Sequence, residues 1–213
     1  MAKILMAIPT MYDLHPVTSM SCTELLKRRN DLEYIAVIGR PVDFARNKII
    51  RMFKQYDEFT HLFFLDNDIG FPLDVIDKFL SLDVPIASGC YPVIVKGNLK
   101  WALADREENG HYELLQTLKS KYGPFEVDGG GAGCLFVKRE VFDKVEWPWF
   151  RWNETAEGMP MSEDIWFSMK CNEAGYKTTV HPQVLCNHFK QINLTSLVQP
   201  EAIKPDGDYV VLR

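Results

Sequence analysis

Short apolar runs alternate with segments of helical periodicity in the first half of the chain, and this rhythm constrains the fold more than any other feature. The apolar runs cover residues 4–8, 32–38, 61–65 and 85–89, and the segments between them cover residues 18–29, 44–56 and 74–82. A short continuous apolar run is typical of a strand that is buried on both faces. Strands that alternate with helices in this way predict a parallel sheet covered by helices.

The second half of the chain is less regular. The sequence predicts a hairpin-like segment over 93–104, a glycine-rich loop over 129–133, and strands over 134–138 and 178–180. A helix is expected over 162–174, with Ser162 as its N-cap and Gly175 just past its end. Pro72 is expected in the first turn of the helix that continues over 74–82. The fold class that follows is a single-domain α/β fold with a central, mostly parallel β-sheet flanked by helices.

Composition limits the partners that the chain can have. Its 213 residues are 46% hydrophobic, which is enough for one sizeable core. The formal net charge of -5 does not favour a polyanion, so no nucleic-acid partner is expected. The five cysteines include no C-x-x-C pair, which favours a reducing compartment. No apolar stretch reaches the length of a membrane span, and we expect a soluble, cytoplasmic protein.

The triplet Asp66-Asn67-Asp68 follows the apolar run 61–65 directly and is the strongest candidate for chemistry. In an extended segment, carboxylates two residues apart point the same way and can share one cation. Ligands of open α/β sheets bind outside the carboxyl ends of the strands, where these carboxylates would lie. Asp, Asn and Gly also favour turns, so a plain turn is the alternative. A calcium loop is disfavoured, because Gly70 stands at the fifth place and an EF-hand needs its glycine at the sixth.

Three weaker patterns could contribute to a site. Glu163 and Asp164 stand at a predicted helix start, where acids either stabilise the helix dipole or face a cleft. His188 is either a structural histidine or a ligand that suits a manganese-like ion. The glycines between Asp128 and Cys134 permit close backbone approach or form a flexible turn. This glycine run fits neither phosphate-loop signature.

Taken together and in order, these residues resemble the GT-A glycosyltransferases, in particular the compact inverting members of family 2. The resemblance covers residues 4–190 and rests on the D-x-D triplet, the glycine-rich loop, the x-E-D motif Ser162-Glu163-Asp164, and His188 as the late histidine. Ala45-Arg46-Asn47, in the helix before the D-x-D strand, adds to it. We therefore expect a GT-A domain over residues 1–190, followed by a C-terminal tail over 191–213 that could lead into a further domain. The chain resembles the short transferases that bacteria and some viruses encode.

The resemblance implies a donor site for a nucleotide sugar and a divalent ion, Mn²⁺ or Mg²⁺. Asp68 and His188 would bind the metal, and Asp66 would contact either the metal or the donor ribose. The whole triplet, Asn67 included, would face the donor. Such an ion would bridge to the diphosphate, because magnesium-like ions use few protein carboxylates together with substrate phosphates.

The resemblance also implies how the nucleotide is held. Thr10, after the first strand, and Arg46 would help to hold the nucleotide and its pyrophosphate. A UDP-sugar is the expected donor, because UDP is the most common donor nucleotide of the family. The chain departs from the family where an early aspartate usually reads the base, since Val37-Ile38-Gly39-Arg40 ends the second strand instead.

On the acceptor side, the resemblance assigns Asp164 as the general base. It would take the proton from an acceptor hydroxyl during in-line attack on the anomeric carbon, which inverts the configuration. Glu163 would orient the acceptor or cap the helix. The acceptor is expected to be a glycan or another hydroxyl compound, and the aromatic side chains that could contact it are Trp147, Trp149, Trp152 and Tyr91. Core packing is the alternative for these side chains.

Two other functions fit parts of the sequence. A nucleotidyltransferase that makes nucleotide sugars would need a glycine-rich, basic segment after the first strand, where this chain has Pro9-Thr10-Met11-Tyr12-Asp13. A non-catalytic carbohydrate- or nucleotide-binding module with a decayed active site is the other alternative. The acids of the D-x-D and x-E-D motifs are both intact, which argues against such decay. A metal-dependent hexosyltransferase is therefore the favoured function.

Overall fold

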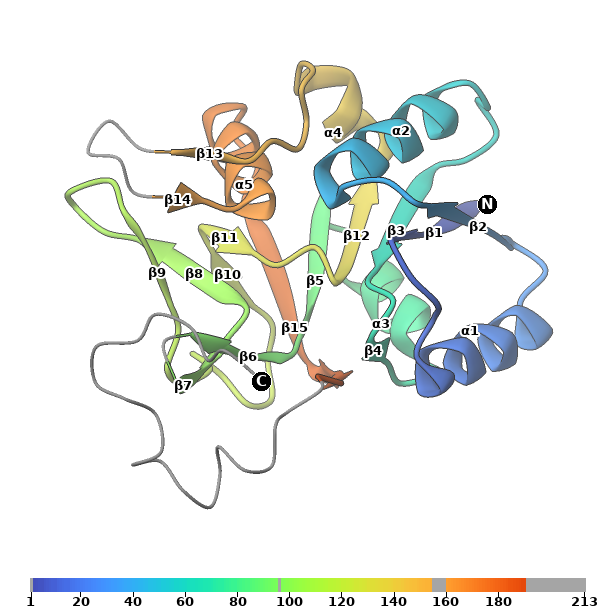
Figure 1. Ribbon diagram of the computed structural model, residues 1–213, viewed down its shortest axis with the longest axis horizontal. Coiled ribbons are helices and arrows are strands. Elements are labelled where there is room, and N and C mark those ends of the chain that lie inside the picture. The colour runs from blue at the N-terminus through green and yellow to red at the C-terminus, as the bar shows by residue number, and fades with distance from the viewer. Residues whose placement is uncertain (1, 96, 155–159, 191–213) are drawn as a thin grey trace, which may run out of the picture.

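In the residues that the computed structural model describes, 2–95, 97–154 and 160–190, seven strands form the central sheet (Figure 1). They are β1 (Ile4–Thr10), β2 (Leu32–Ile38), β3 (His61–Leu65), β5 (Ile86–Cys90), β10 (Phe125–Val127), β12 (Cys134–Lys138) and β15 (Thr178–Leu185). Their spatial order is β10-β15-β5-β12-β3-β1-β2. Strands β10 and β12 run antiparallel to their neighbours, and the other strands share one direction. The sheet is therefore mostly parallel, as the sequence predicts.

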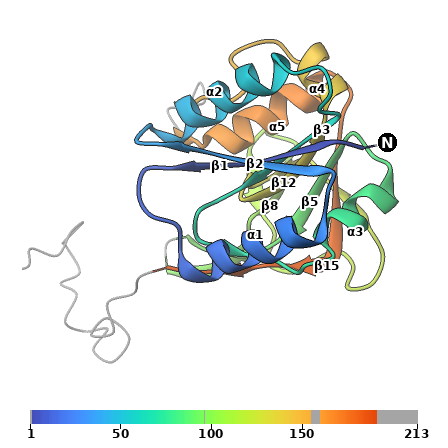
Figure 2. The same cartoon turned by 90° about the vertical axis from the view of Figure 1, so that its right-hand side faces the viewer.

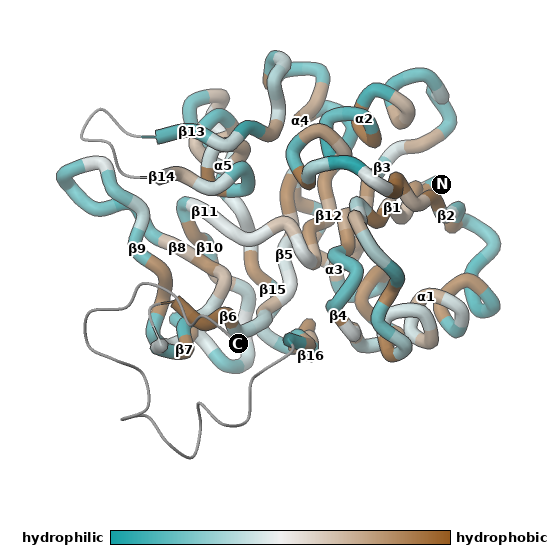
Figure 3. Tube along the Cα trace, in the orientation of Figure 1, coloured by the Kyte–Doolittle hydropathy of each residue, from teal (hydrophilic) through white to brown (hydrophobic). Residues whose placement is uncertain are grey.

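Helices cover both faces of the sheet (Figure 2). One face carries α1 (Pro16–Arg28) and α3 (Val75–Leu82), and the other carries α2 (Val42–Lys54), α4 (Arg139–Lys144) and α5 (Glu163–Glu173). Alternate side chains of β1 enter the two cores, with Met6 packing on the α1 side and Leu5 on the α2 side. Apolar segments accordingly concentrate along the sheet strands (Figure 3). Burial on both faces explains why β1, β3 and most of β12 are continuous apolar runs.

Shorter strands extend the fold beyond the sheet. They are β4 (Ile69–Gly70), β6 (Pro92–Val95), β7 (Asn98–Trp101), β8 (Leu103–Arg106), β9 (Tyr112–Leu114), β11 (Gly129–Gly130), β13 (Asn153–Glu154), β14 (Pro160–Met161) and β16 (Asn187–His188). The hairpin of β6 and β7 overlaps the expected segment 93–104 and begins one residue earlier, at Pro92. Strand β16 pairs antiparallel with β4, so that His188 lies opposite Ile69, directly after the D-x-D triplet. This pairing carries the end of the described chain to the end of β3.

Several element boundaries differ from the sequence prediction. Helix α2 begins at Val42, after Pro41 at its N-cap, two residues before the predicted start. Pro72 lies outside α3, and its carbonyl accepts a hydrogen bond from Val75 N at 3.1 Å. Strand β15 continues past Val180 to Leu185, with a register shift between these two residues. Pro182, which has no N–H to donate to the ladder, lies within this irregular stretch.

Two expectations concern the whole chain. None of the helices in the described residues is long and apolar enough to cross a membrane. The predicted C-terminal tail, residues 191–213, lies outside the described residues.

The start of β3 gives a prediction about stability. Burial, assisted by the nearby charge of Lys138 and opposed by Asp83, lowers the pKa of His61 from 6.5 to about 4. Its ring stacks on Phe136 with a centroid distance of 4.7 Å. Because the unfolded chain binds this proton more readily, the contribution of His61 to stability is present above pH 6.5 and is lost as the pH falls toward 4. The free energy of unfolding, measured with urea, should therefore fall less between pH 6.5 and pH 4 in His61→Phe than in the wild type. An equal fall in the two proteins would contradict the lowered pKa of His61.

Candidate active site

The D-x-D triplet forms a turn at the carboxyl end of β3. Ile69 N donates to Asp66 O at 3.3 Å, and Asp66 N donates to Gly133 O at 3.0 Å. Asn67 Nδ2 donates to Asp13 O at 3.1 Å, which ties the turn to the loop after β1. The extended geometry expected for this triplet is therefore wrong, because the chain reverses here to enter β4. As a result, Asp66 and Asp68 contact different partners.

Asp68 is held by the end of the described chain. His188 Nε2 lies 3.5 Å from Asp68 Oδ1, and Lys190 Nζ lies 2.6 Å from Asp68 Oδ2. Burial alone would raise the pKa of Asp68, but the hydrogen bonds from His188 and Lys190 lower it. His188 Nδ1 lies 2.7 Å from Pro92 O. Because a carbonyl oxygen only accepts, Nδ1 donates to Pro92 O, and Nε2 is the ring nitrogen that faces Asp68.

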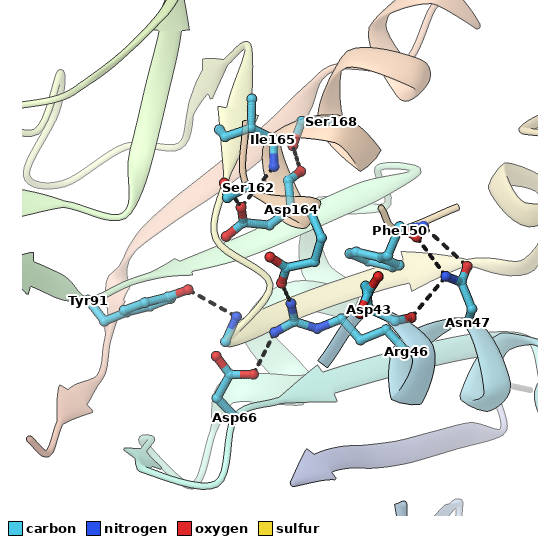
Figure 4. A network of polar contacts seen from close by, with 12 residues as sticks. Asp43, Arg46, Asn47, Asp66, Tyr91, Phe150, Ser162, Asp164, Ile165 and Ser168 are labelled. Atoms are coloured by element: carbon cyan, nitrogen blue, oxygen red, sulfur yellow. Dashed lines mark hydrogen bonds and ion pairs between the residues drawn. The ribbon is translucent and has the colours of Figure 1, made fainter. Parts of the chain in front are cut away.

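Asp66 belongs to a second group of charges, built around a buried arginine (Figure 4). Arg46, on α2, is 2% exposed, and its Nη2 donates to Asp66 Oδ1 at 2.6 Å. Its Nη1 donates to Glu163 Oε1, on α5. Both terminal nitrogens of its guanidinium therefore bind carboxylates, and its expected contact with the pyrophosphate stays a prediction. Arg46 thereby links the D-x-D turn to the x-E-D helix.

Glu163 lies inside the protein beside Arg46. Its side chain is 6% exposed. Burial raises the pKa of this carboxyl well above its usual range, and the positive charge of Arg46 opposes that rise. Glu163 therefore contacts the charge network inside the protein, and its role beside the acceptor or at the helix start stays a prediction.

Asp164 is the more accessible acid of the pair. Its Oδ1 accepts hydrogen bonds from Ile165 N at 2.8 Å and from Ser162 Oγ. Ser162 stands at the expected N-cap position of α5, but its side chain makes no capping hydrogen bond to the backbone. The hydroxyl binds Asp164 instead and fixes one carboxylate oxygen. An acid with one fixed oxygen and partial exposure can accept a proton from a bound hydroxyl.

The glycine-rich segment passes between these groups. A Cβ on Gly133 would lie 2.9 Å from Asp66 Oδ2, and one on Gly131 would lie 2.0 Å from Tyr91 Oη. Tyr91 Oη accepts from Gly133 N at 3.0 Å, and Ser168 Oγ of α5 accepts from Gly130 N at 3.3 Å. Glycine is needed here because a side chain would collide with the residues that frame the site.

A pocket of about 240 Å³ opens beside the D-x-D turn, where β1, β2 and β3 end. Its lining includes all three residues of the triplet and Thr10. The hydroxyl of Thr10 is engaged in a turn, since its Oγ1 accepts from Tyr12 N at 3.1 Å and donates to Tyr12 O at 2.5 Å. Thr10 therefore stabilises the loop after β1, and the exposed side chains of Met11 and Tyr12 in this loop line the pocket.

Sequence reasoning missed part of this lining, namely Met11, Tyr12, Arg40 and Lys190. Tyr12 is 77% exposed and offers an aromatic face. Its position directly after β1 was a usable signal, as was that of Arg40 after β2, because ligands bind at these strand ends. Lys190 gave no local signal, since its contact with Asp68 joins residues 122 positions apart.

The predicted acceptor aromatics lie in different environments. Trp149 is 7% exposed and its Nε1 donates to Val145 O at 2.7 Å, and Tyr91 is 5% exposed. These two residues pack in the interior, as the core-packing alternative for them has it, and their acceptor contacts stay a prediction. Trp147 and Trp152 are 59% and 55% exposed and line a separate pocket of about 560 Å³.

Asp68 and His188 are the two neighbouring side chains that could bind a metal ion. Among the described residues, no group of three or more His, Cys, Asp or Glu side chains could hold a metal ion. Asp66 is hydrogen-bonded to Arg46, whereas Asp68 lies beside His188, and the assignment of these three residues as metal ligands stays a prediction. One carboxylate, one imidazole nitrogen and substrate phosphates nevertheless fit a divalent ion of the magnesium or manganese kind.

Comparisons with known proteins agree with the fold. No known protein family and no curated protein matches the sequence. The structure resembles A197 from STIV, with a TM-score of 0.63 and 21% identity over 89% of this chain and 86% of that one. It also resembles GalNAc-T7, in a structure with UDP, GalNAc and Mn²⁺, with a TM-score of 0.57 and 12% identity. That match covers 90% of this chain, which spans 44% of the GalNAc-T7 chain. The chain thus has a GT-A-like glycosyltransferase fold.

Proposed function

We propose that the protein is a metal-dependent glycosyltransferase that moves a sugar from a nucleotide-sugar donor, with UDP-sugars favoured, to a hydroxyl of a glycan or other acceptor. The observation that carries this proposal is the position of Arg46. It binds Asp66 at the end of β3 and Glu163 beside Asp164, so one buried cation joins the two acidic motifs. The mixed sheet and its GT-A-like neighbours are consistent with this function.

On the donor side, the pocket beside the D-x-D turn would receive the nucleotide and its diphosphate. Asp68 and His188 would hold a divalent ion, which as a Lewis acid would neutralise the charge of the diphosphate leaving group. Lys190 binds Asp68 from the same side and supplies a second positive charge. Tyr12 offers a stacking surface for the base, and Arg40 lines the same pocket.

On the acceptor side, Asp164 would act as the general base. Ser162 and Ile165 N fix one of its oxygens, so that its carboxylate has a defined orientation. The acceptor oxygen would attack the anomeric carbon as its proton passes to Asp164, and the nucleoside diphosphate would leave on the opposite side, with inversion. Glu163 and Arg46 act as positioning residues, because they contact the acidic motifs from inside the protein.

The metal site can be tested without knowledge of the acceptor. We expect Asp68→Asn to weaken Mn²⁺-dependent UDP binding at least about tenfold, because the variant loses a charged metal ligand. His188→Gln should act in the same direction. The measurement is calorimetric titration of UDP with Mn²⁺ and with a chelator, and Asp74→Asn, at an exposed carboxylate paired with Lys78, is the matched control. Unchanged metal dependence in both site variants would refute the ligand assignment.

Tyr12 gives a prediction about the nucleotide base. Base stacking on an aromatic side chain contributes about 1–3 kcal/mol, so Tyr12→Ala should weaken UDP binding about tenfold or more. Tyr12→Phe should bind UDP nearly as well as the wild type, because it retains the ring. Tyr122→Ala removes another exposed aromatic side chain, 84% exposed and absent from the pocket lining, and serves as the control. Equal affinities of Tyr12→Ala and wild type would show that the base binds elsewhere.

A further inference from the structure

The larger pocket is lined by residues of α2 and of the segment 147–152, together with Arg40. We call it the α2 groove. Its volume is about 560 Å³, which is more than twice that of the pocket at the D-x-D turn, about 240 Å³. Neither Asp164 nor any residue of the D-x-D triplet lines it. The α2 groove is therefore a second pocket in addition to the one at the proposed donor site.

Three aromatic rings of the α2 groove are exposed to solvent. Phe44 is 64% exposed, Trp147 59% and Trp152 55%. Large aromatic side chains are usually buried, and a cluster of exposed ones marks an interaction site. Flat aromatic faces pack well against the C–H faces of sugar rings.

The α2 groove is also positively charged. Arg40, Lys48, Arg51 and Arg151 line it together with one acid, Asp43. Within the part of the chain that the structure describes, these four cations form no salt bridge with an acid. The guanidinium of Arg51 instead lies 5.7 Å from the ring centroid of Trp147. In a chain with a net charge of -5, such a local excess of positive charge indicates an anionic ligand.

The wall of the α2 groove is held in place by Asn47. Its Oδ1 accepts from Trp149 N at 3.1 Å and from Phe150 N at 3.2 Å, and its Nδ2 donates to Phe150 O at 2.6 Å. Trp149 and Phe150 are buried, so the segment between Trp147 and Trp152 is anchored at its centre. Binding to a preformed surface requires less loss of conformational entropy.

We propose that the α2 groove binds an acidic oligosaccharide, with the tryptophans stacked on its sugar rings and the arginines paired with its carboxylates. Arginine matches a carboxylate with two parallel hydrogen bonds. Arg40 lines both the α2 groove and the pocket at the D-x-D turn, so the two sites adjoin. The proposal that this oligosaccharide is the acceptor chain rests on the proposed function. The proposal that it binds to the α2 groove does not depend on that function. A nucleic acid is disfavoured, because its backbone needs a basic track longer than one pocket.

The test is direct binding of trigalacturonic acid, measured by calorimetry in the presence of a chelator and without nucleotide. Its methyl-esterified form has the same rings without the charges and is the matched ligand control. We expect the acid to bind at least about tenfold more tightly than the ester, and Arg51→Gln and Trp147→Ala each to weaken binding of the acid about tenfold or more. Lys121→Gln and Tyr122→Ala change an exposed cation and an exposed aromatic ring outside the α2 groove and should bind like the wild type.

The outcomes separate this proposal from the proposed function. Equal binding of acid and ester, or binding that survives Arg51→Gln and Trp147→Ala, would overturn the α2 groove as an acidic-sugar site. Binding of a short oligothymidylate in preference to the acid would overturn it in favour of a nucleic-acid site. Titration of UDP with Mn²⁺ into the same variants reports on the donor site alone, so either site can fail while the other is retained.

Discussion

The variant Asp164→Asn should retain donor binding and lose transfer. Asparagine has the same shape and keeps an oxygen that can accept from Ile165 N and Ser162 Oγ, so the start of α5 should be unchanged. It cannot take up a proton from the acceptor hydroxyl. Loss of general base catalysis typically lowers the rate by about 10²- to 10⁴-fold. The rate is measured as release of nucleoside diphosphate with a donor and acceptor that support turnover by the wild type.

The control for this variant lies on the same helix. Glu173→Gln neutralises an exposed acid at the other end of α5 and should leave the rate unchanged. Donor affinity of Asp164→Asn, measured by calorimetry with Mn²⁺, should equal that of the wild type. Normal transfer by Asp164→Asn would refute the base assignment, whereas loss of donor binding would indicate a structural role instead.

The variant Arg46→Met should be the most destabilised of those considered. It leaves Glu163 buried and Asp66 partly buried without their shared cation, and breaking a buried ion pair costs about 3–5 kcal/mol. The high pKa of Glu163 limits this loss, because the carboxyl can take up a proton. The free energy of unfolding, measured with urea at neutral pH, should fall by an amount in this range.

A second substitution distinguishes charge from packing. Arg46→Met combined with Glu163→Gln removes both buried charges and should recover part of the lost stability. Arg28→Met, at an exposed position of α1, is the control and should change stability by less than about 0.5 kcal/mol. If Arg46→Met were no less stable than Arg28→Met, the buried network would not contribute to the stability of the fold.

The fold was predictable from local patterns. The apolar runs at β2 and β3 have the predicted bounds, although β3 is buried along most of its length whereas β2 is an edge strand with several exposed residues. Strand β15 was predicted too short, because it continues past Val180 through a register shift that leaves no local signal. The predicted end of this strand was therefore wrong, because pairing with the neighbouring strand continues beyond the locally apolar residues.

The site was predictable in its residue types and less so in its contacts. Asp66, Asp68, Glu163, Asp164 and His188 stood out by order and residue type, and the assignment of their roles stays a prediction. The pairing of Arg46 with Glu163 spans 117 positions in sequence and leaves no local pattern. The sequence also cannot tell an exposed tryptophan from a buried one, as Trp147 and Trp149 illustrate two residues apart.

The most direct test of the central claim is calorimetric titration of UDP into the wild-type protein with Mn²⁺ and again with a chelator, beside GDP, CMP and dTDP. The account predicts that UDP binds tightly, and only when the metal is present. Absence of binding by all four nucleotides in the presence of Mn²⁺ would contradict it, and would show that this GT-A-like fold serves a function other than sugar transfer from a nucleotide donor.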